Sequence, residues 1–245
     1  MNHLLKQYLD GKYSEVWNLI NQEDLESLKM SYGSQIDEIF NEAFTRIQYN
    51  TNIVFQILDS YNYKYKNFGQ RNKYDLHYVP ADKETAGLLA NFENKIKNEG
   101  FLPRSITEFY KKFKVLDFRG SFQNLDYDFL TDALYIIPIH AFVGLNDDLF
   151  SWETDKVDVP YVLFSPDEYV KEDISGDIGY GLPVSQQRKA DDFLINYKRQ
   201  STFLDYLRFC FEWACLPNLA FKEKEQIPED IKALINQVRQ EIRQF

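Results

Sequence analysis

Apolar residues recur every three or four positions over most of the first hundred residues, the spacing of one face of an α-helix. The longest such pattern runs from Ser34 to about Tyr61 without proline or glycine. A second covers Lys83 to Asn98, and Gly100 follows where a helix C-terminal glycine is expected. Nearer the start, Ser14 can cap a short helix. The pattern predicts a helical section over residues 1–100.

A further helix is predicted where the chain reads LPRSITEFYKKF. Ser105 stands at the expected cap and Glu108 follows three residues later, so each side chain can accept a hydrogen bond from a backbone amide of the first turn.

After Phe113 the pattern changes to short apolar runs bounded by turn residues, which is typical of strands. The intervals between the runs are too short for the helices that connect parallel strands, so we expect an antiparallel or mixed sheet flanked by helices. The fold class is therefore α+β. Two helices should close the chain, from Ser201 to Pro217 and from about Pro228 to Ile242. The expected strands are Val115–Arg119, Ala133–Ile139, Tyr161–Phe164, Asp177–Val184 and Phe193–Tyr197.

Two sections are expected, a helical one over residues 1–100 and an α+β one with C-terminal helices over residues 101–245. No linker rich in proline, glycine or serine separates them, so we expect the first to pack on the second. The stretch from Tyr61 to Pro80 is interpreted as a strand or loop.

The 245 residues carry a formal net charge of −10, which disfavours binding to nucleic acids or anionic membranes. One stretch is locally basic and rich in tyrosine, but we interpret it as a strand edge protected by lysines. No apolar run approaches the roughly 20 residues that span a bilayer, and no signal peptide is recognisable, so a cytoplasmic protein is expected. The residues of the basic stretch are Lys64, Lys66, Arg71 and Lys73.

Sequence motifs for catalysis, metal binding or cofactor binding are absent, so we expect a non-enzymatic protein without a cofactor. The three histidines are dispersed and the two cysteines do not have zinc-site spacing. A glycine cluster over residues 175–181 leads into Leu182 and Pro183, not into a helix as a phosphate site would require. It predicts a tight turn and a close-packed strand entry, with a binding loop as the alternative.

Paired carboxylates leave a hydrolase open as an alternative function, because two carboxylates at a fixed separation can perform glycoside hydrolysis. A structural interaction protein whose N-terminal helices dimerise is a further alternative. The pairs are Asp126 with Asp128, Asp147 with Asp148, and Asp191 with Asp192.

Four segments carry a family resemblance. They are Leu102, Pro103, Ser105, Glu108, Phe109 and Tyr110 in a first motif, Asp132 to Leu134 with Ile136 and Pro138, Gly179 to Pro183, and Thr202, Phe203, Leu204, Tyr206 and Leu207 in the closing helix. Through these segments, residues 101 to 219 resemble the SUKH superfamily, which includes bacterial immunity proteins and relatives of fungal cell-wall regulators. Where that family usually has glycines after its first helix, this chain has Lys114 and Val115.

The resemblance implies a protein-binding module that neutralises a toxin domain. A negatively charged surface would suit a basic partner, because complementary charge accelerates association. Aromatic residues among the acids are candidate anchors. The expected partner-binding residues are Asp147, Asp148, Trp152, Glu153, Asp155, Asp173, Asp177 and Tyr180.

Overall fold

The computed structural model of the chain describes residues 4–66, 77–122, 131–153, 158–176 and 178–245. The fold is α+β, as the sequence predicts, and the paired strands in the described part are antiparallel. The helices are α1 (Leu4–Leu9), α2 (Tyr13–Gln22), α3 (Leu25–Tyr32), α4 (Gln35–Ser60), α5 (Lys83–Ile96), α6 (Arg104–Lys112), α7 (Ile139–Leu145), α8 (Glu168–Lys171), α9 (Phe203–Glu212) and α10 (Glu229–Glu241), with 3-10 turns η1 (Pro217–Phe221) and η2 (Lys224–Gln226).

The described strands form three small sheets. Their orders are β1-β4, β2-β3-β5 and β6-β7-β8. The strands are β1 (Lys64–Tyr65), β2 (Tyr78–Pro80), β3 (Phe113–Asp117), β4 (Gly120–Ser121), β5 (Tyr135–Ile136), β6 (Phe150–Glu153), β7 (Asp158–Ser165) and β8 (Tyr180–Pro183).

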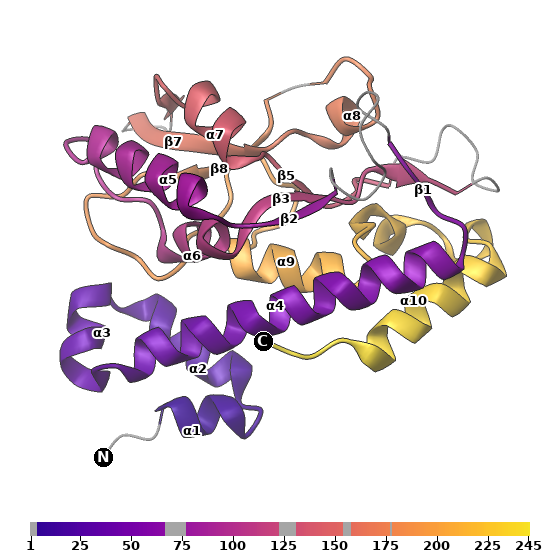
Figure 1. Cartoon of the computed structure of the whole chain (residues 1–245), viewed down its shortest axis with the longest axis horizontal. Coiled ribbons are helices and arrows are strands. Elements are labelled where there is room, and N and C mark those ends of the chain that lie inside the picture. The colour runs from indigo at the N-terminus through magenta and orange to yellow at the C-terminus, as the bar shows by residue number, and fades with distance from the viewer. Residues whose placement is uncertain (1–3, 67–76, 123–130, 154–157, 177) are drawn as a thin grey trace.

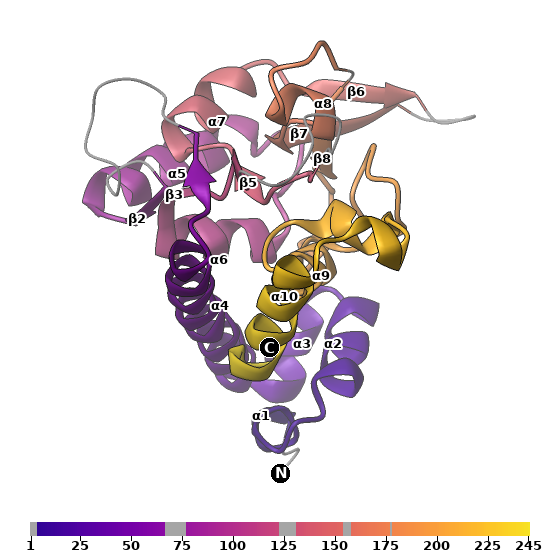
Figure 2. The same cartoon turned by 90° about the vertical axis from the view of Figure 1, so that its right-hand side faces the viewer.

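The long helix α4 runs between the two parts of the molecule. In Figure 1 the sheets with α5, α6 and α7 lie above it, α1 and α2 lie below one end, and α3 lies beside that end. Figure 2 shows α10 beside α4. The α4 helix contacts α1, α3, α6 and α10. Apolar residues of both sections enter one core, for example Phe40 of α4 and Phe109 of α6. The N-terminal helices and the α+β part therefore share a hydrophobic core.

The C-terminal tail is hydrogen-bonded to α4. The Asn50 side chain donates to the carbonyl of Arg243 at 2.8 Å and accepts from the amide of the same residue at 2.8 Å. Arg46 donates to the carbonyl of Gln244 at 2.9 Å. The two hydrogen bonds with Arg243 satisfy the polar side chain of Asn50, which is buried on α4.

Two predicted caps are wrong. Ser105 lies inside α6, and its hydroxyl donates to Asp191, because the first amides of the helix already donate to the carbonyls of Lys189 and Ala190. Ser14 lies inside α2, where the N-cap is Lys12.

Several strand predictions need correction as well. The apolar run Ala133–Ile139 forms only the short strand β5 before α7 begins. The segment 193–197 forms isolated β-bridges, in which Ile195 pairs with Gly181 and Phe193 pairs with Thr202. The first run is apolar because most of it lies in the core, which does not require a continuous ladder. In the second run Leu194 and Tyr197 pack on the core, whereas Phe193 is 59% exposed.

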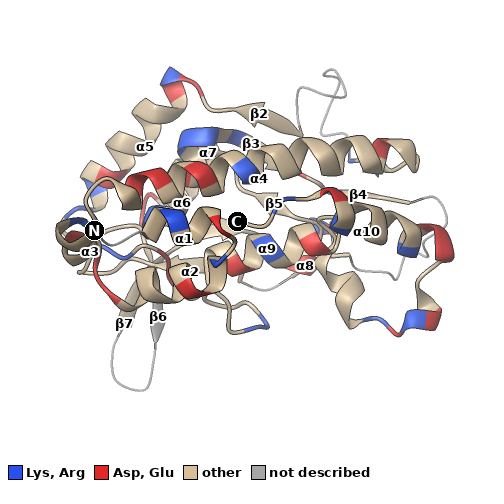
Figure 3. Ribbon diagram, turned by 90° about the horizontal axis from the view of Figure 1, so that it is seen from below, with Lys and Arg blue, Asp and Glu red and all other residues tan. Residues whose placement is uncertain are grey.

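Charged residues of both signs are distributed over the helices. Viewed from below, both signs appear along α9 and α10, whereas α2 carries only the acidic Glu15 and α4 carries four acids and Arg46 (Figure 3). Among the described residues, no helix has the length and apolar content needed to cross a membrane.

Candidate functional site

The short helix α8 has its polarity inverted. Its charged residues Glu168 and Lys171 point inward and are 4% and 0% exposed. Its other two residues, Tyr169 and Val170, are 44% and 41% exposed. Lysine and glutamate are almost never fully buried unless they are paired, and an apolar residue on a helix normally faces the core. An arrangement of this kind therefore needs an explanation in its contacts.

Lys171 is fixed by a buried polar network. Its Nζ lies 2.6 Å from Asp132 Oδ1 and 4.8 Å from the centre of the Tyr180 ring. The Tyr180 hydroxyl donates to the second oxygen of Asp132 at 3.1 Å, and the hydroxyl of Tyr206 lies 3.5 Å from Nζ. Burial raises the pKa of Asp132 and Lys171 opposes that rise. The network joins α8 to the start of β8, to α9 and to the segment before β5.

Glu168 forms the second anchor of α8. Both of its carboxylate oxygens lie 2.5 Å from Lys198 Nζ, and Asn218 of η1 donates to one of them at 3.1 Å. Asp167 caps the helix, because its side chain accepts from the amide of Val170 at 2.8 Å. A four-residue helix cannot be stable alone, so these side chains hold α8 in place.

The chain after α8 turns back over the helix. A Cβ atom at Gly176 would overlap the Asp167 carboxylate, and one at Gly179 would overlap the carbonyl of Ser165. Gly181 lies equally close to the ring of Tyr161. The glycines are therefore needed for close packing, which is the turn and strand entry that the sequence predicts.

This geometry presents apolar side chains to solvent beside acids. Ile174 and Ile178 are 48% and 49% exposed and follow Tyr169 and Val170 in sequence. Lys66 lies 3.6 Å from Glu172 and 3.2 Å from Asp173, and it donates to the carbonyl of Lys171 at 2.5 Å. We call the following residues the α8 surface: Tyr169, Val170, Glu172, Asp173, Ile174 and Ile178.

The predicted partner-binding residues do not form one cluster. Asp147 forms an ion pair with Lys95 of α5, whereas Asp173 pairs with Lys66 after β1. Figure 1 places the end of α5 and the β1 strand on opposite sides of the β-containing layer. Asp148 is exposed.

The remaining predicted residues differ in environment. Tyr180 is 3% exposed and binds Asp132, so its ring cannot contact a partner in this conformation. Trp152 and Glu153 lie in β6 opposite Val159 and Asp158. Asp155 and Asp177 lie outside the described residues.

The carboxylate pairs that suggested a hydrolase are held by structural contacts where the structure describes them. Asp191 accepts from the Ser105 hydroxyl at 2.6 Å and from the amide of Leu204 at 2.9 Å, and burial raises its pKa to about 6. Asp192 pairs with Lys189 at 2.9 Å. Asp126 and Asp128 lie outside the described residues.

Metal binding and thiol chemistry find no support in the described part of the chain. No group of three or more histidine, cysteine or acidic side chains there could hold a metal ion. Cys210 and Cys215 are free and buried, and burial raises the pKa of both thiols. His140 lies at the exposed start of α7, and His77 is buried with Nδ1 3.2 Å from the carbonyl of Asp117.

Sequence reasoning missed the anchors Asp132, Glu168 and Lys171, because charged residues are normally assigned to solvent. A signal was present: Asp167 can cap a helix, and Glu168 and Lys171 fall three apart on the same face.

Comparison of the chain with protein-family models, with curated proteins and with solved structures finds no match.

Proposed function

We propose that the chain is a non-enzymatic binding protein that recognises a basic protein partner through the α8 surface. The observation that carries this proposal is the inversion of α8, in which a buried ion pair at Lys171 and a partly exposed one at Glu168 hold apolar side chains outward. Burying charged groups costs several kcal/mol per ion unless they are well paired, so the core alone gives no reason for this arrangement. A site for a partner does give one.

The chemistry of the α8 surface defines the partner. Protein interfaces have an apolar centre and a polar rim, and here Ile174 and Ile178 would form the centre with Glu172 and Asp173 at the rim. The net charge of −10 favours association with a positively charged protein. The resemblance to SUKH immunity proteins supports the same class of function, and a toxin domain would then be the partner.

Anchoring also supports tight binding. Because α8 is held by Asp132, Lys198 and Asn218, its apolar side chains would lose little freedom on association. Preorganised apolar residues of this kind are typical anchors of interfaces.

The test is affinity capture from the native cell with three forms of the chain. The wild type should retain a basic protein in stoichiometric amount. The double variant Ile174→Ser/Ile178→Ser should lose it, since truncating central interface residues costs about 2 kcal/mol or more each. Met30→Ser is the matched control, because Met30 is 82% exposed on α3 and outside the α8 surface.

Circular dichroism of all three proteins checks that the fold is unchanged. Equal retention of the same partner by wild type and double variant contradicts the proposal, and so does the absence of any stoichiometric protein together with the absence of a toxin gene nearby.

A further inference from the structure

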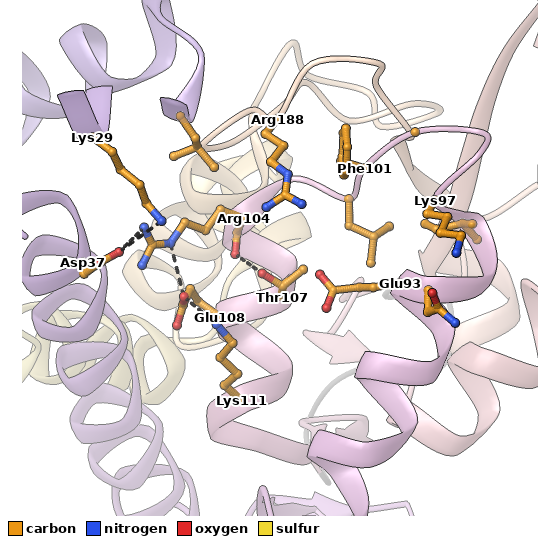
Figure 4. Close-up of a pocket in the computed structure, with 15 residues that line it drawn as sticks. Lys29, Asp37, Glu93, Lys97, Phe101, Arg104, Thr107, Glu108, Lys111 and Arg188 are labelled. Carbon is orange, nitrogen blue, oxygen red and sulfur yellow. Dashed lines mark hydrogen bonds and ion pairs between the residues drawn. The ribbon is translucent and has the colours of Figure 1, made fainter. Parts of the chain in front are cut away.

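A polar pocket of about 480 Å³ lies away from the α8 surface, between α3, α4, α5 and α6 (Figure 4). Its volume falls in the range of pockets that hold small molecules. Five lysine and arginine residues and three acidic residues line it, so the pocket has two excess positive charges in a chain with a net charge of −10. A positive cleft in an acidic protein concentrates anions.

At one end of the pocket the charged side chains are paired with one another. Arg104 lies 2.7 Å from Asp37 and 3.2 Å from Glu108, and Lys111 lies 2.9 Å from Glu108. Figure 4 shows these side chains joined on the side that faces α3 and α4. Lys29 also lies 3.9 Å from Asp37, so this end holds three cations against two acids, and each of them takes part in an ion pair. An incoming anion would therefore find its cationic partner at the other end.

Arg188 is the cation at that other end. The side chain is exposed, and its guanidinium lies 4.5 Å from the centre of the Phe101 ring. Within the described residues the guanidinium makes no hydrogen bond or ion pair. Both sides of this stack are fixed by the backbone, because the Arg188 carbonyl accepts from Leu25 at 2.9 Å and Phe101 exchanges two hydrogen bonds with Ser185. Stacking thus positions an arginine whose donors remain available.

The pocket also contains a carboxylate and apolar walls. Glu93 points into the same space as Arg188 in Figure 4. Burial raises the pKa of Glu93, and the charges of Lys111 and Arg188 oppose that rise only in part. Glu93 repels any anion, and it repels a multiply charged one such as phosphate more strongly than a single carboxylate. A single carboxylate matches the planar fork of Arg188. Leu25, Ile96 and Leu102, which are 8%, 3% and 6% exposed, line the pocket and leave a narrow apolar strip for a hydrocarbon skeleton.

We propose that this pocket binds a small organic molecule with one carboxylate, which pairs with Arg188 while its apolar part packs on Leu25, Ile96 and Leu102.

The experiment is an NMR titration of the full chain with benzoate, followed through the backbone amides of the pocket. Benzoate should give saturable shifts there, whereas benzyl alcohol, which lacks the carboxylate, and inorganic phosphate should bind at least about tenfold more weakly. Arg188→Gln should weaken benzoate binding about tenfold or more, and Glu93→Gln should strengthen it because a negative charge is removed.

Arg199→Gln is the matched control. Arg199 is exposed and lies 3.9 Å from the centre of the Phe209 ring, so it is an equally stacked arginine outside the pocket. The Arg199→Gln substitution should leave benzoate binding unchanged. The proposal is overturned if benzoate gives no saturable shifts at the pocket, if benzyl alcohol or phosphate binds as well as benzoate does, or if Arg188→Gln has no more effect than Arg199→Gln.

Discussion

Lys171 Nζ lies 2.6 Å from Asp132 Oδ1, and the two side chains are 0% and 2% exposed. This pair connects the helix that carries the α8 surface to the interior. The ammonium also faces the Tyr180 ring, whose hydroxyl binds the same carboxylate. The outward position of Tyr169 and Val170 therefore depends on a buried ion pair.

Removing one partner of this pair should be strongly destabilising. Lys171→Met leaves Asp132 as an uncompensated buried charge, which costs about 3 to 5 kcal/mol in free energy of unfolding. The double variant Lys171→Met/Asp132→Asn should recover part of that loss, and asparagine tolerates the positive φ of 49° at this position. Urea unfolding measures the free energy of unfolding of the wild type and of both variants.

Lys232→Met serves as the control for that comparison. Lys232 pairs with the largely exposed Glu229 on α10, so its loss should cost no more than about 1 kcal/mol. If Lys171→Met and Lys232→Met lower the free energy of unfolding equally, the buried pair does not hold α8.

Gly176→Ala should disturb the cap of α8. The new Cβ would overlap the carboxylate of Asp167, which accepts from the amide of Val170. We expect a loss of about 1 to 2 kcal/mol in thermal or urea unfolding, typical of a lost cap. Gly144→Ala in α7 is the control, because no atom lies within 4 Å of its Cβ position, and alanine favours helix. A smaller loss for Gly176→Ala than for Gly144→Ala would contradict this account.

Asp191 should make stability depend on pH. Burial raises its pKa to about 6, above the value of about 3.9 in an unfolded chain, so between those values the folded protein binds the extra proton. The stabilisation that comes from this extra proton is therefore fully present below about pH 4 and is lost as the pH rises through 6. The free energy of unfolding should fall by about 3 kcal/mol over that range.

The comparison with Asp191→Asn isolates this contribution from those of other groups. The free energy of unfolding of the wild type, minus that of the variant, should fall as pH rises from 4 to 7. A constant difference over that range would mean that Asp191 titrates normally.

The two thiols should be unreactive in the folded protein. Cys210 and Cys215 are fully buried, and burial raises the pKa of each thiol. A thiol-reactive dye should therefore label neither residue in buffer and both in denaturant. Labelling in buffer faster than the measured rate of unfolding would contradict the buried placement.

The sequence predicts long helices better than short elements. The regular pattern of α4 is 26 residues long, so its existence and its ends near Ser34 and Tyr61 follow from periodicity alone. The four residues of α8 are too few to show a period. Ser105 has a capping pattern but binds Asp191, which is 86 positions away. Such a long-range contact overrides a local preference.

The candidate site was only partly predictable for the same reason. The acids and glycines around Asp173 indicated from the sequence that this segment is a candidate binding surface. The structure adds the exposed isoleucines beside it. Tyr180 looked like an exposed anchor because aromatic residues among acids often are. It is buried because the buried carboxylate of Asp132 needs a hydrogen-bond donor.

The most direct test of the α8 surface is a calorimetric titration of the captured partner with wild type, Ile174→Ser/Ile178→Ser and Met30→Ser at low and high salt. The account predicts that the double variant binds at least about tenfold more weakly than Met30→Ser. It also predicts that salt weakens binding of the wild type, because the partner is basic. Equal affinity of the double variant and Met30→Ser would contradict the central claim that the α8 surface presents apolar residues to a partner.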